Sequence, residues 1–402
     1  MNITKIALAA TVALIGAQAQ AATVYLAGAS ATSANYQSAL TSLCTANAGT
    51  ATTLSSGSNL FAIKCSKDFS GLPGVNAVSF NVSGGSFTAV TTSAGSDTAD
   101  FINPAASTTS SIVMTGARKS EGGFMDIDAA AFPASELGAA GLSEAPATSA
   151  ASFSQVFGVA VSPALYTALQ TAQGLAGCGI DSVTPACQPN ITRAQYTSIV
   201  AETFNTAKMD ISATLNVGNA GDKLTVCRRV STSGTQASSN QFFLNFFVGG
   251  DGAAAGALNP ADQATYGAGS GLDSYEVQEG SGTGNARTCL SAAGYALGVL
   301  SMENAPDLTN RVGGQRADRK WRYVKVNGVH AYEPAVNSTA TAKAGQYEFW
   351  FTSHKYGHTA NGQSVVDAID SQLSSGVSLP GLFDNASSQA QRSSNTSPIY
   401  FN

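Results

Sequence analysis

A strand, a turn of small residues and a helix follow one another twice in this sequence, and this unit restricts the fold more than any other feature. The first copy has the strand Val24–Ala27, the turn Gly28–Thr32 and then a helical stretch. The second has the strand Leu224–Val226, the turn Cys227–Thr235 and a helical stretch from Gln236. Strands that alternate with helices are typical of largely parallel sheets covered by helices. We therefore predict an α/β fold.

Further elements follow from local patterns. Apolar runs and alternation predict strands, and apolar residues at helical spacing predict helices. The predicted strands include 75–82, 111–114, 156–161 and 321–326, and the predicted helices include 163–174, 193–203, 286–297 and 364–374.

The turn of the second unit carries the donors that an oxyanion needs. The first N–H groups of a helix have no partner within the helix, and the helix dipole favours negative charge there. Ser233 and Thr235 add hydroxyl groups, and Gly234 lets the backbone come close. Arg229 can bind two oxygens side by side, although Arg228 competes for this role because neighbours on a strand point to opposite faces. An ordinary capped helix is the alternative interpretation.

The two turns together resemble those of type II periplasmic binding proteins, above all the phosphate-binding proteins of bacterial ABC importers. In that family the first loop reads Gly-Ala-Gly-Ala-Thr, which is close to Gly28–Thr32. The later loop reads Arg-Ser-Asp-Gly-Ser-Gly-Thr, which Arg229–Thr235 matches at Arg, Ser, Gly and Thr. Weaker similarities occur in the family's order along most of the chain, at 157–163, 190–199, 279–285, 296–301, 324–329 and 344–350.

This resemblance implies the type II fold, in which two lobes are joined by two crossover strands. The crossings would lie near 157–161 and 297–301, so that lobe one comprises 22–156 plus 302–402 and lobe two comprises 157–301. Ligands of open α/β sheets lie at the carboxyl ends of strands and at helix N-termini. Both turns would occupy such positions.

The resemblance also implies a ligand-binding set drawn from both lobes. Thr32 would be the first donor of lobe one, with a plain helix cap as the alternative. A Ser/Gly-rich turn would supply the second from Ser83 or Ser86, between which the sequence does not choose. The predicted set is Thr32, Ser83, Ser86, Asp126, Arg229, Ser233, Gly234 and Thr235.

A carboxylate in this set would decide which anion binds. Asp126 stands nearest the family's acidic position, and Asp128 is the alternative. A carboxylate accepts the proton of a protonated oxyanion but repels a fully ionised one such as sulfate, because both are then acceptors. Met125 stands where the family has Ser, and this departure bears on phosphate specificity more than on anion binding.

The N-terminus predicts export. Lys5 precedes an apolar run at 6–15, and Ala19-Gln20-Ala21 is a small-x-small site, so residues 1–21 read as a signal peptide cleaved after Ala21, or alternatively after Ala19. The site has no Cys for a lipid anchor, and no later run reaches the roughly 18 apolar residues of a membrane span. We expect a periplasmic or secreted protein.

Six cysteines in an exported chain indicate disulfides. Six allow fifteen pairings, which a sequence cannot resolve. Proximity favours Cys44–Cys65 and Cys178–Cys187, which leaves Cys227–Cys289. The last bond would hold the Arg229 turn against the helix that follows Gly284-Asn285. The cysteine spacings match no zinc site, and no metal or other cofactor is expected.

Composition and missing motifs restrict the function. A formal net charge of −5 gives no general attraction for nucleic acid or anionic lipid. The sequence has no Gly-x-Ser-x-Gly elbow, no His-Glu-x-x-His and no complete Walker A loop, so we do not expect an enzyme.

The resulting prediction is a monomeric binding protein that holds a tetrahedral oxyanion, phosphate above all, between two lobes. The resemblance implies an ABC permease of the inner membrane as its partner. The alternative is a secreted or surface protein that keeps the fold without transport, and a phosphate-ester hydrolase on the same scaffold is a third hypothesis.

Overall fold

A computed structural model describes the chain from residue 22 to residue 401. The described part leaves out 176, 201–210, 220–221, 245–274, 293, 308–316, 332–338, 375–380 and 396. The predicted signal peptide therefore lies outside the described residues.

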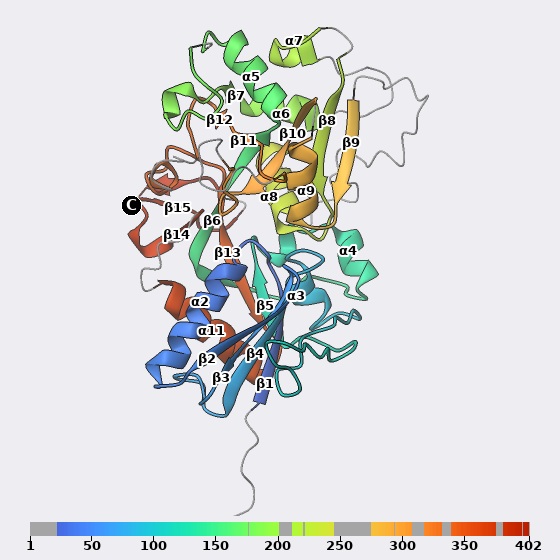
Figure 1. The fold of residues 1–402 in the computed structure, drawn as a ribbon, viewed down its shortest axis with the longest axis vertical. Coiled ribbons are helices and arrows are strands. Elements are labelled where there is room, and N and C mark those ends of the chain that lie inside the picture. Colours follow the sequence, from blue (N-terminus) through green and yellow to red (C-terminus); the bar gives the residue numbers. More distant parts are fainter. Residues whose placement is uncertain are drawn as a thin grey trace, which may run out of the picture.

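The molecule has two α/β lobes, one above the other in Figure 1. The sheet of the lower lobe contains, in spatial order, β2 (Ala51–Ser56), β3 (Leu60–Cys65), β4 (Val75–Asn81), β1 (Ala22–Gly28), β5 (Gly122–Met125), β13 (Trp350–Gly357) and β6 (Ser149–Val161). The sheet of the upper lobe continues with β10 (Tyr295–Ser301), β8 (Leu224–Arg229) and β9 (Tyr275–Gly280). The predicted two-lobe α/β fold is confirmed.

Helices cover these sheets and bury their apolar faces. The lower lobe has α2 (Ser33–Ala46), α3 (Thr88–Thr91), α4 (Ala134–Ala139) and α11 (Ala360–Ser374), and the upper lobe has α5 (Pro163–Ala172), α6 (Arg193–Val200), α7 (Ile211–Leu215), α8 (Gly234–Leu244) and α9 (Thr283–Leu290). Among the described residues, no helix combines the length and the apolar character needed to cross a membrane.

Strand β6 belongs to both lobes. Its residues 149–156 pair antiparallel with β13, and its residues 157–161 pair antiparallel with β10. The residues from Phe153 to Val161 are buried, and they are apolar from Val156 onward, whereas Ser154 and Gln155 are buried polar residues. Strands that are buried on both faces read as unbroken apolar runs, which explains why only the second half of β6 was predicted.

Residues 322–326 lie against the upper lobe. There β11 (Arg322–Tyr323) pairs with β6 at Val161 and Ala160, and β12 (Lys325–Val326) pairs with β7 (Asn190–Ile191). The predicted boundary at residue 301 assigns 302–402 to lobe one, whereas these pairings connect 322–326 to strands of the upper lobe. The boundary itself stays a prediction.

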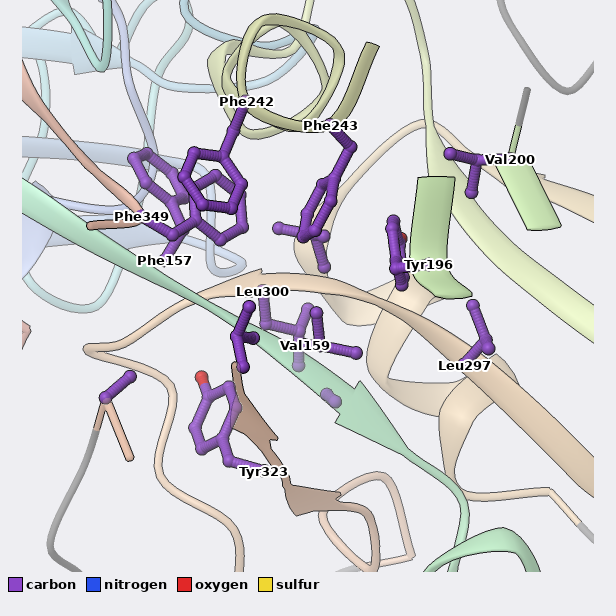
Figure 2. Close-up of a cluster of buried hydrophobic side chains, with 14 of the residues drawn as sticks. Phe157, Val159, Tyr196, Val200, Phe242, Phe243, Leu297, Leu300, Tyr323 and Phe349 are labelled. Atoms are coloured by element: carbon purple, nitrogen blue, oxygen red, sulfur yellow. The ribbon is translucent and has the colours of Figure 1, made fainter. Parts of the chain in front are cut away.

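An aromatic cluster connects α8 to the strands that link the lobes (Figure 2). The Phe242 ring stacks on Phe349 with centroids 4.5 Å apart, and Phe349 lies 5.5 Å from the Phe157 ring of β6. Apolar contacts of this size hold a helix firmly. The C-terminal part of α8 is thereby packed against β6 through Phe349.

Two local predictions were wrong. The helix predicted at 286–297 is α9, which begins at Thr283 and ends at Leu290, because β10 already starts at Tyr295. Asn285 accepts a hydrogen bond from the N–H of Gly282 at 3.0 Å and so helps to begin the helix early. The strand predicted at 111–114 forms isolated bridges instead, with Ser111 opposite Thr108 and Met114 opposite Ile102.

The two disulfides expected from proximity, Cys44–Cys65 and Cys178–Cys187, are present, and so is the remaining pair, Cys227–Cys289. The third joins β8 to α9.

Candidate functional site

Arg229 ends β8 and is buried, with 4% of its surface exposed. Its Nη1 donates to Thr283 Oγ1 at 2.8 Å, and its Nε and Nη2 donate to the carbonyl oxygens of Gly280 and Ser281, each at 3.2 Å. Among the described residues, Arg229 has no carboxylate within ion-pair distance. Burial lowers its pKa to about 10, and Asp126 and Glu303 oppose this shift. Within the described part of the chain, this buried cation is therefore held by neutral groups alone.

The neighbouring arginine is in a different situation. Arg228 forms an ion pair with Glu279 on β9, with 2.5 Å between Nη1 and Oε2. Its Nη1 also donates to the carbonyl oxygen of Arg229 at 3.1 Å. Arg228 thus has an acidic partner of its own, whereas Arg229 has none among the residues that the structure describes.

Asp126 follows β5, whose glycines bring two backbones into close contact. A Cβ on Gly123 would lie 1.7 Å from the carbonyl oxygen of Ala27 on β1, so only glycine fits there. Asp126 is 4% exposed, and its Oδ2 accepts a hydrogen bond from Ser86 Oγ at 2.8 Å. Its Oδ1 is buried and has no hydrogen-bond partner among the described residues. Burial raises its pKa to about 6, while Ser86 and Arg229 act in the opposite direction.

Asp128, the alternative carboxylate, forms its hydrogen bonds with other residues. Asp128 Oδ1 accepts hydrogen bonds from the N–H of Ala130 and from Thr148 Oγ1, both at 3.1 Å. It caps the short helix Ala129–Ala131, and its Oδ2 lies 4.0 Å from His354 Nδ1. The geometry thus favours Asp126 over Asp128 as the ligand-binding carboxylate.

Gly234 begins α8 of the upper lobe and lies against the Ser86–Asp126 pair of the lower lobe. A Cβ on Gly234 would be 2.4 Å from Ser86 Oγ and 2.7 Å from Asp126 Oδ2. Its neighbours Ser233 and Thr235 are buried, with 2% and 5% exposed. The preceding turn meets the lower lobe too, since the carbonyl of Thr232 accepts a hydrogen bond from the N–H of Phe87 at 3.0 Å. The upper and lower lobes are thus in direct contact at the start of α8.

We expect Gly234→Ala to weaken anion binding at least tenfold, because the added methyl group would displace Ser86 and Asp126 or hold the lobes apart. Gly284→Ala is the matched control, since its Cβ would meet nothing nearer than 4.0 Å. Titration of both variants with phosphate tests this. Equal affinities in the two variants would show that Gly234 does not limit closure.

The hydrogen bonds of Thr32 and Ser83 go to residues other than Ser86 and Asp126. The buried Thr32 hydroxyl donates to the hydroxyl of Tyr36 on α2. Ser83 donates its N–H to Asn81 Oδ1 at 2.9 Å and borders a polar cavity of about 500 Å³ together with Thr88. Of the two serines between which the sequence did not choose, Ser86 is the one that contacts Asp126. The ligand roles of all eight predicted residues stay predictions.

Sequence reasoning missed two side chains at this site. Thr283 accepts from Arg229 and lies 3.5 Å from the hydroxyl of Ser30 in the first turn, so it connects two of the predicted loops. The position of Thr283 in the Gly-Ser-Gly-Thr-Gly stretch could have indicated a place near the predicted anion site. Glu303, which follows β10, lies outside every motif. Within the described part of the chain, no three His, Cys, Asp or Glu side chains gather as a metal site would require.

No known protein-family model matches this chain, and no curated protein sequence matches it either. Two solved structures are similar to it in outline. One is a candidate phosphate ABC transporter substrate-binding protein with bound phosphate from Clostridium perfringens, with 13% identity, coverage of 87% of this chain and 93% of that chain, and a TM-score of 0.41. The other is a candidate phosphate-binding protein from Planctomyces limnophilus DSM 3776, with 14% identity, 88% coverage of each chain and a TM-score of 0.36. At these values the likeness says nothing about the ligand of this chain.

Proposed function

We propose that this chain is an exported solute-binding protein whose lobes close over a protonated tetrahedral oxyanion, phosphate above all. One observation carries the proposal. Arg229 is a buried arginine and Asp126 is a buried carboxylate, and among the described residues the first has no acidic partner and the second has an oxygen, Oδ1, without a hydrogen-bond partner; both belong to the same closed region between the lobes.

Among the described residues, Arg229 lacks a counter-anion and Asp126 Oδ1 lacks a hydrogen-bond donor, and hydrogen phosphate supplies both. A buried cation is costly unless an anion compensates it, and a buried acceptor is costly unless a donor reaches it. Hydrogen phosphate offers negative oxygens to Arg229 and a hydroxyl donor to Asp126 Oδ1. Sulfate offers the negative oxygens but no proton. A sulfate oxygen and Asp126 Oδ1 are both acceptors, so they would repel each other. The site should therefore select phosphate and arsenate over sulfate.

The biological setting is part of the same proposal. Three disulfides and the predicted signal peptide support a periplasmic or secreted location. The chain acts as a monomer, without turnover, and delivers its ligand to an ABC permease in the inner membrane. The alternative, a secreted or surface protein that uses the same fold without transport, shares the site but not the partner.

Thermal unfolding of the ligand-stripped mature chain tests the ligand class. A ligand that binds only the folded state raises the midpoint of unfolding as its concentration rises. We expect phosphate and arsenate to raise the midpoint and sulfate and chloride to leave it unchanged. Equal shifts with sulfate would exclude the proposed role of Asp126, and no shift with any anion would exclude the function.

Asp126→Asn should weaken phosphate binding by about 1.5–3 kcal/mol, the usual contribution of a hydrogen bond to a charged group. The asparagine N–H can donate to sulfate, so sulfate should bind better than it binds the parent protein. Asp128→Asn is the matched control because Asp128 contacts Thr148 and Ala130 instead. Calorimetric titration of both variants with each anion measures the change. An unchanged preference for phosphate in Asp126→Asn would contradict the assignment.

A further inference from the structure

Thr283, the first residue of α9, lies between the buried arginine and the lower lobe. Its Oγ1 accepts a hydrogen bond from Arg229 Nη1 at 2.8 Å. The same oxygen lies 3.5 Å from the hydroxyl oxygen of Ser30, in the turn that follows β1. Helix α9 belongs to the upper lobe and β1 to the lower lobe (Figure 1). One hydroxyl group therefore contacts both the cation of the candidate site and a turn of the opposite lobe.

The loop before α9 surrounds the guanidinium of Arg229 with acceptors. Gly280 and Ser281 offer carbonyl oxygens to Nε and Nη2, and Thr283 offers its hydroxyl to Nη1. A guanidinium is planar and has five N–H donors. Acceptors on all three nitrogens hold this plane in one orientation. Among the described residues, these contacts leave two N–H groups, one on Nη1 and one on Nη2, for an anion.

Two of the three acceptors belong to the backbone. Gly280 pairs with Arg229 in the parallel register of β8 and β9, and its carbonyl oxygen also accepts the N–H of Val230 at 3.2 Å. The N–H of Gly282 donates to Asn285 Oδ1 at 3.0 Å, which holds the loop at the start of α9. Thr283 is therefore the acceptor that a side-chain substitution can remove while the backbone acceptors stay in place.

The hydroxyl of Thr283 also has a proton to donate. A hydroxyl group has one donor and two acceptor positions, whereas a guanidinium only donates. Thr283 Oγ1 must accept from Arg229, so its own proton is available to another oxygen, and Ser30 Oγ is such an oxygen. At 3.5 Å this contact is longer than the usual distance of about 2.7–2.8 Å, so it should contribute less than the contact with Arg229.

We propose that Thr283 is a positioning residue that holds the guanidinium of Arg229 in the orientation that binds the anion, and that its contact with Ser30 links this orientation to closure of the lobes. This inference rests on the proposed function and deepens it, because it names a group that regulates the same site. Opening of the lobes would separate Thr283 from Ser30 but leave it on Arg229, since both belong to the upper lobe.

Calorimetric titration with inorganic phosphate tests the contact with Arg229. Thr283→Val keeps the shape of the side chain but removes the acceptor, so phosphate affinity should fall about tenfold or more, the usual effect of losing a hydrogen bond to a charged group. Thr283→Ser restores the hydroxyl and should recover most of the affinity. Thr288→Val is the matched control and should bind phosphate as the parent protein does, because the Thr288 hydroxyl donates to the carbonyl oxygen of Gly284 on the same helix.

A double-mutant cycle separates this role from a purely structural one. Lysine at position 229 lacks the planar fork of arginine, so Thr283→Val should cost little further affinity in the Arg229→Lys background. Equal losses of phosphate affinity in the two backgrounds would show that Thr283 supports the fold and does not act through the arginine.

Stopped-flow measurement of phosphate dissociation from Ser30→Ala tests the contact between the lobes. Because this contact exists when the lobes are closed, its loss should make dissociation about two- to fivefold faster and leave association unchanged. The Ser30→Ala/Thr283→Val variant should dissociate no faster than Thr283→Val alone. An unchanged dissociation rate in Ser30→Ala would overturn the link to closure, and this result decides the matter if Thr283→Val does not fold.

The outcomes separate this inference from the function on which it rests. Phosphate binding by the parent protein, with parental affinity in Thr283→Val, overturns the inference alone. No phosphate binding by the folded parent protein overturns both.

Discussion

Replacement of Arg229 by alanine is expected to weaken phosphate binding by about 2–5 kcal/mol, which is roughly a thirty- to several-thousand-fold loss of affinity. The guanidinium is buried, and its hydrogen bonds within the described chain go to neutral oxygens. The bound anion would then be desolvated without a counter-charge, and this accounts for most of the predicted loss. Calorimetric titration with phosphate measures it.

Arg228→Ala is the matched control because the two arginines are adjacent on β8. Arg228 already has Glu279 as its partner, so its loss should affect stability more than phosphate affinity. We expect phosphate affinity to stay within a few-fold of the parental value. If Arg228→Ala reduced affinity as strongly as Arg229→Ala, the assignment of the ligand-binding arginine would be wrong.

The second large effect concerns stability. Removal of the Cys227–Cys289 disulfide by double alanine substitution should lower the free energy of unfolding by about 4 kcal/mol, from the loop-entropy relation for its separation of 62 residues. The same bond holds β8, which ends in Arg229, against α9, which begins at Thr283. Phosphate affinity should therefore fall as well, since the Arg229–Thr283 contact of 2.8 Å loses its covalent support.

The Cys178–Cys187 bond provides the comparison. It spans 9 residues in a loop of the upper lobe, so its loss should cost less, about 2.6 kcal/mol by the same relation, and should leave phosphate affinity unchanged. Denaturant unfolding and phosphate titration of both double variants test these expectations. Equal phosphate affinity in the two would show that Cys227–Cys289 serves stability alone.

The sequence allowed the strand–turn–helix units to be predicted because their signals are local. Small residues after an apolar strand and before a helix predict β8 and α8 in the right order, although β8 extends to Arg229 and α8 begins at Gly234, two residues before the predicted start at Gln236. The choice between Ser83 and Ser86 could not be made in this way. It depends on the position of Asp126, which lies forty residues beyond Ser86 and follows β5, whereas Ser86 follows β4.

Other parts of the molecule gave no local signal. Strand β5 has four residues, two of them glycine, and its close contact with β1 depends on the missing side chains. The charge environment of Glu303 depends on Asp126, which follows β5, and on Arg287 of α9, and no pattern around residue 303 reports it. Helix α9 was placed too late because Ala and Leu after residue 290 suit a helix, whereas pairing with β6 and β8 makes 295–301 a strand.

The central claim is that Arg229 and Asp126 select an anion that carries a proton. Calorimetric titration of the ligand-stripped chain with phosphate and then with sulfate, at neutral pH and equal ionic strength, tests it most directly. We predict saturable binding of one phosphate per chain and no measurable binding of sulfate. Equal binding of the two anions, or no binding of phosphate by the folded chain, would contradict the claim.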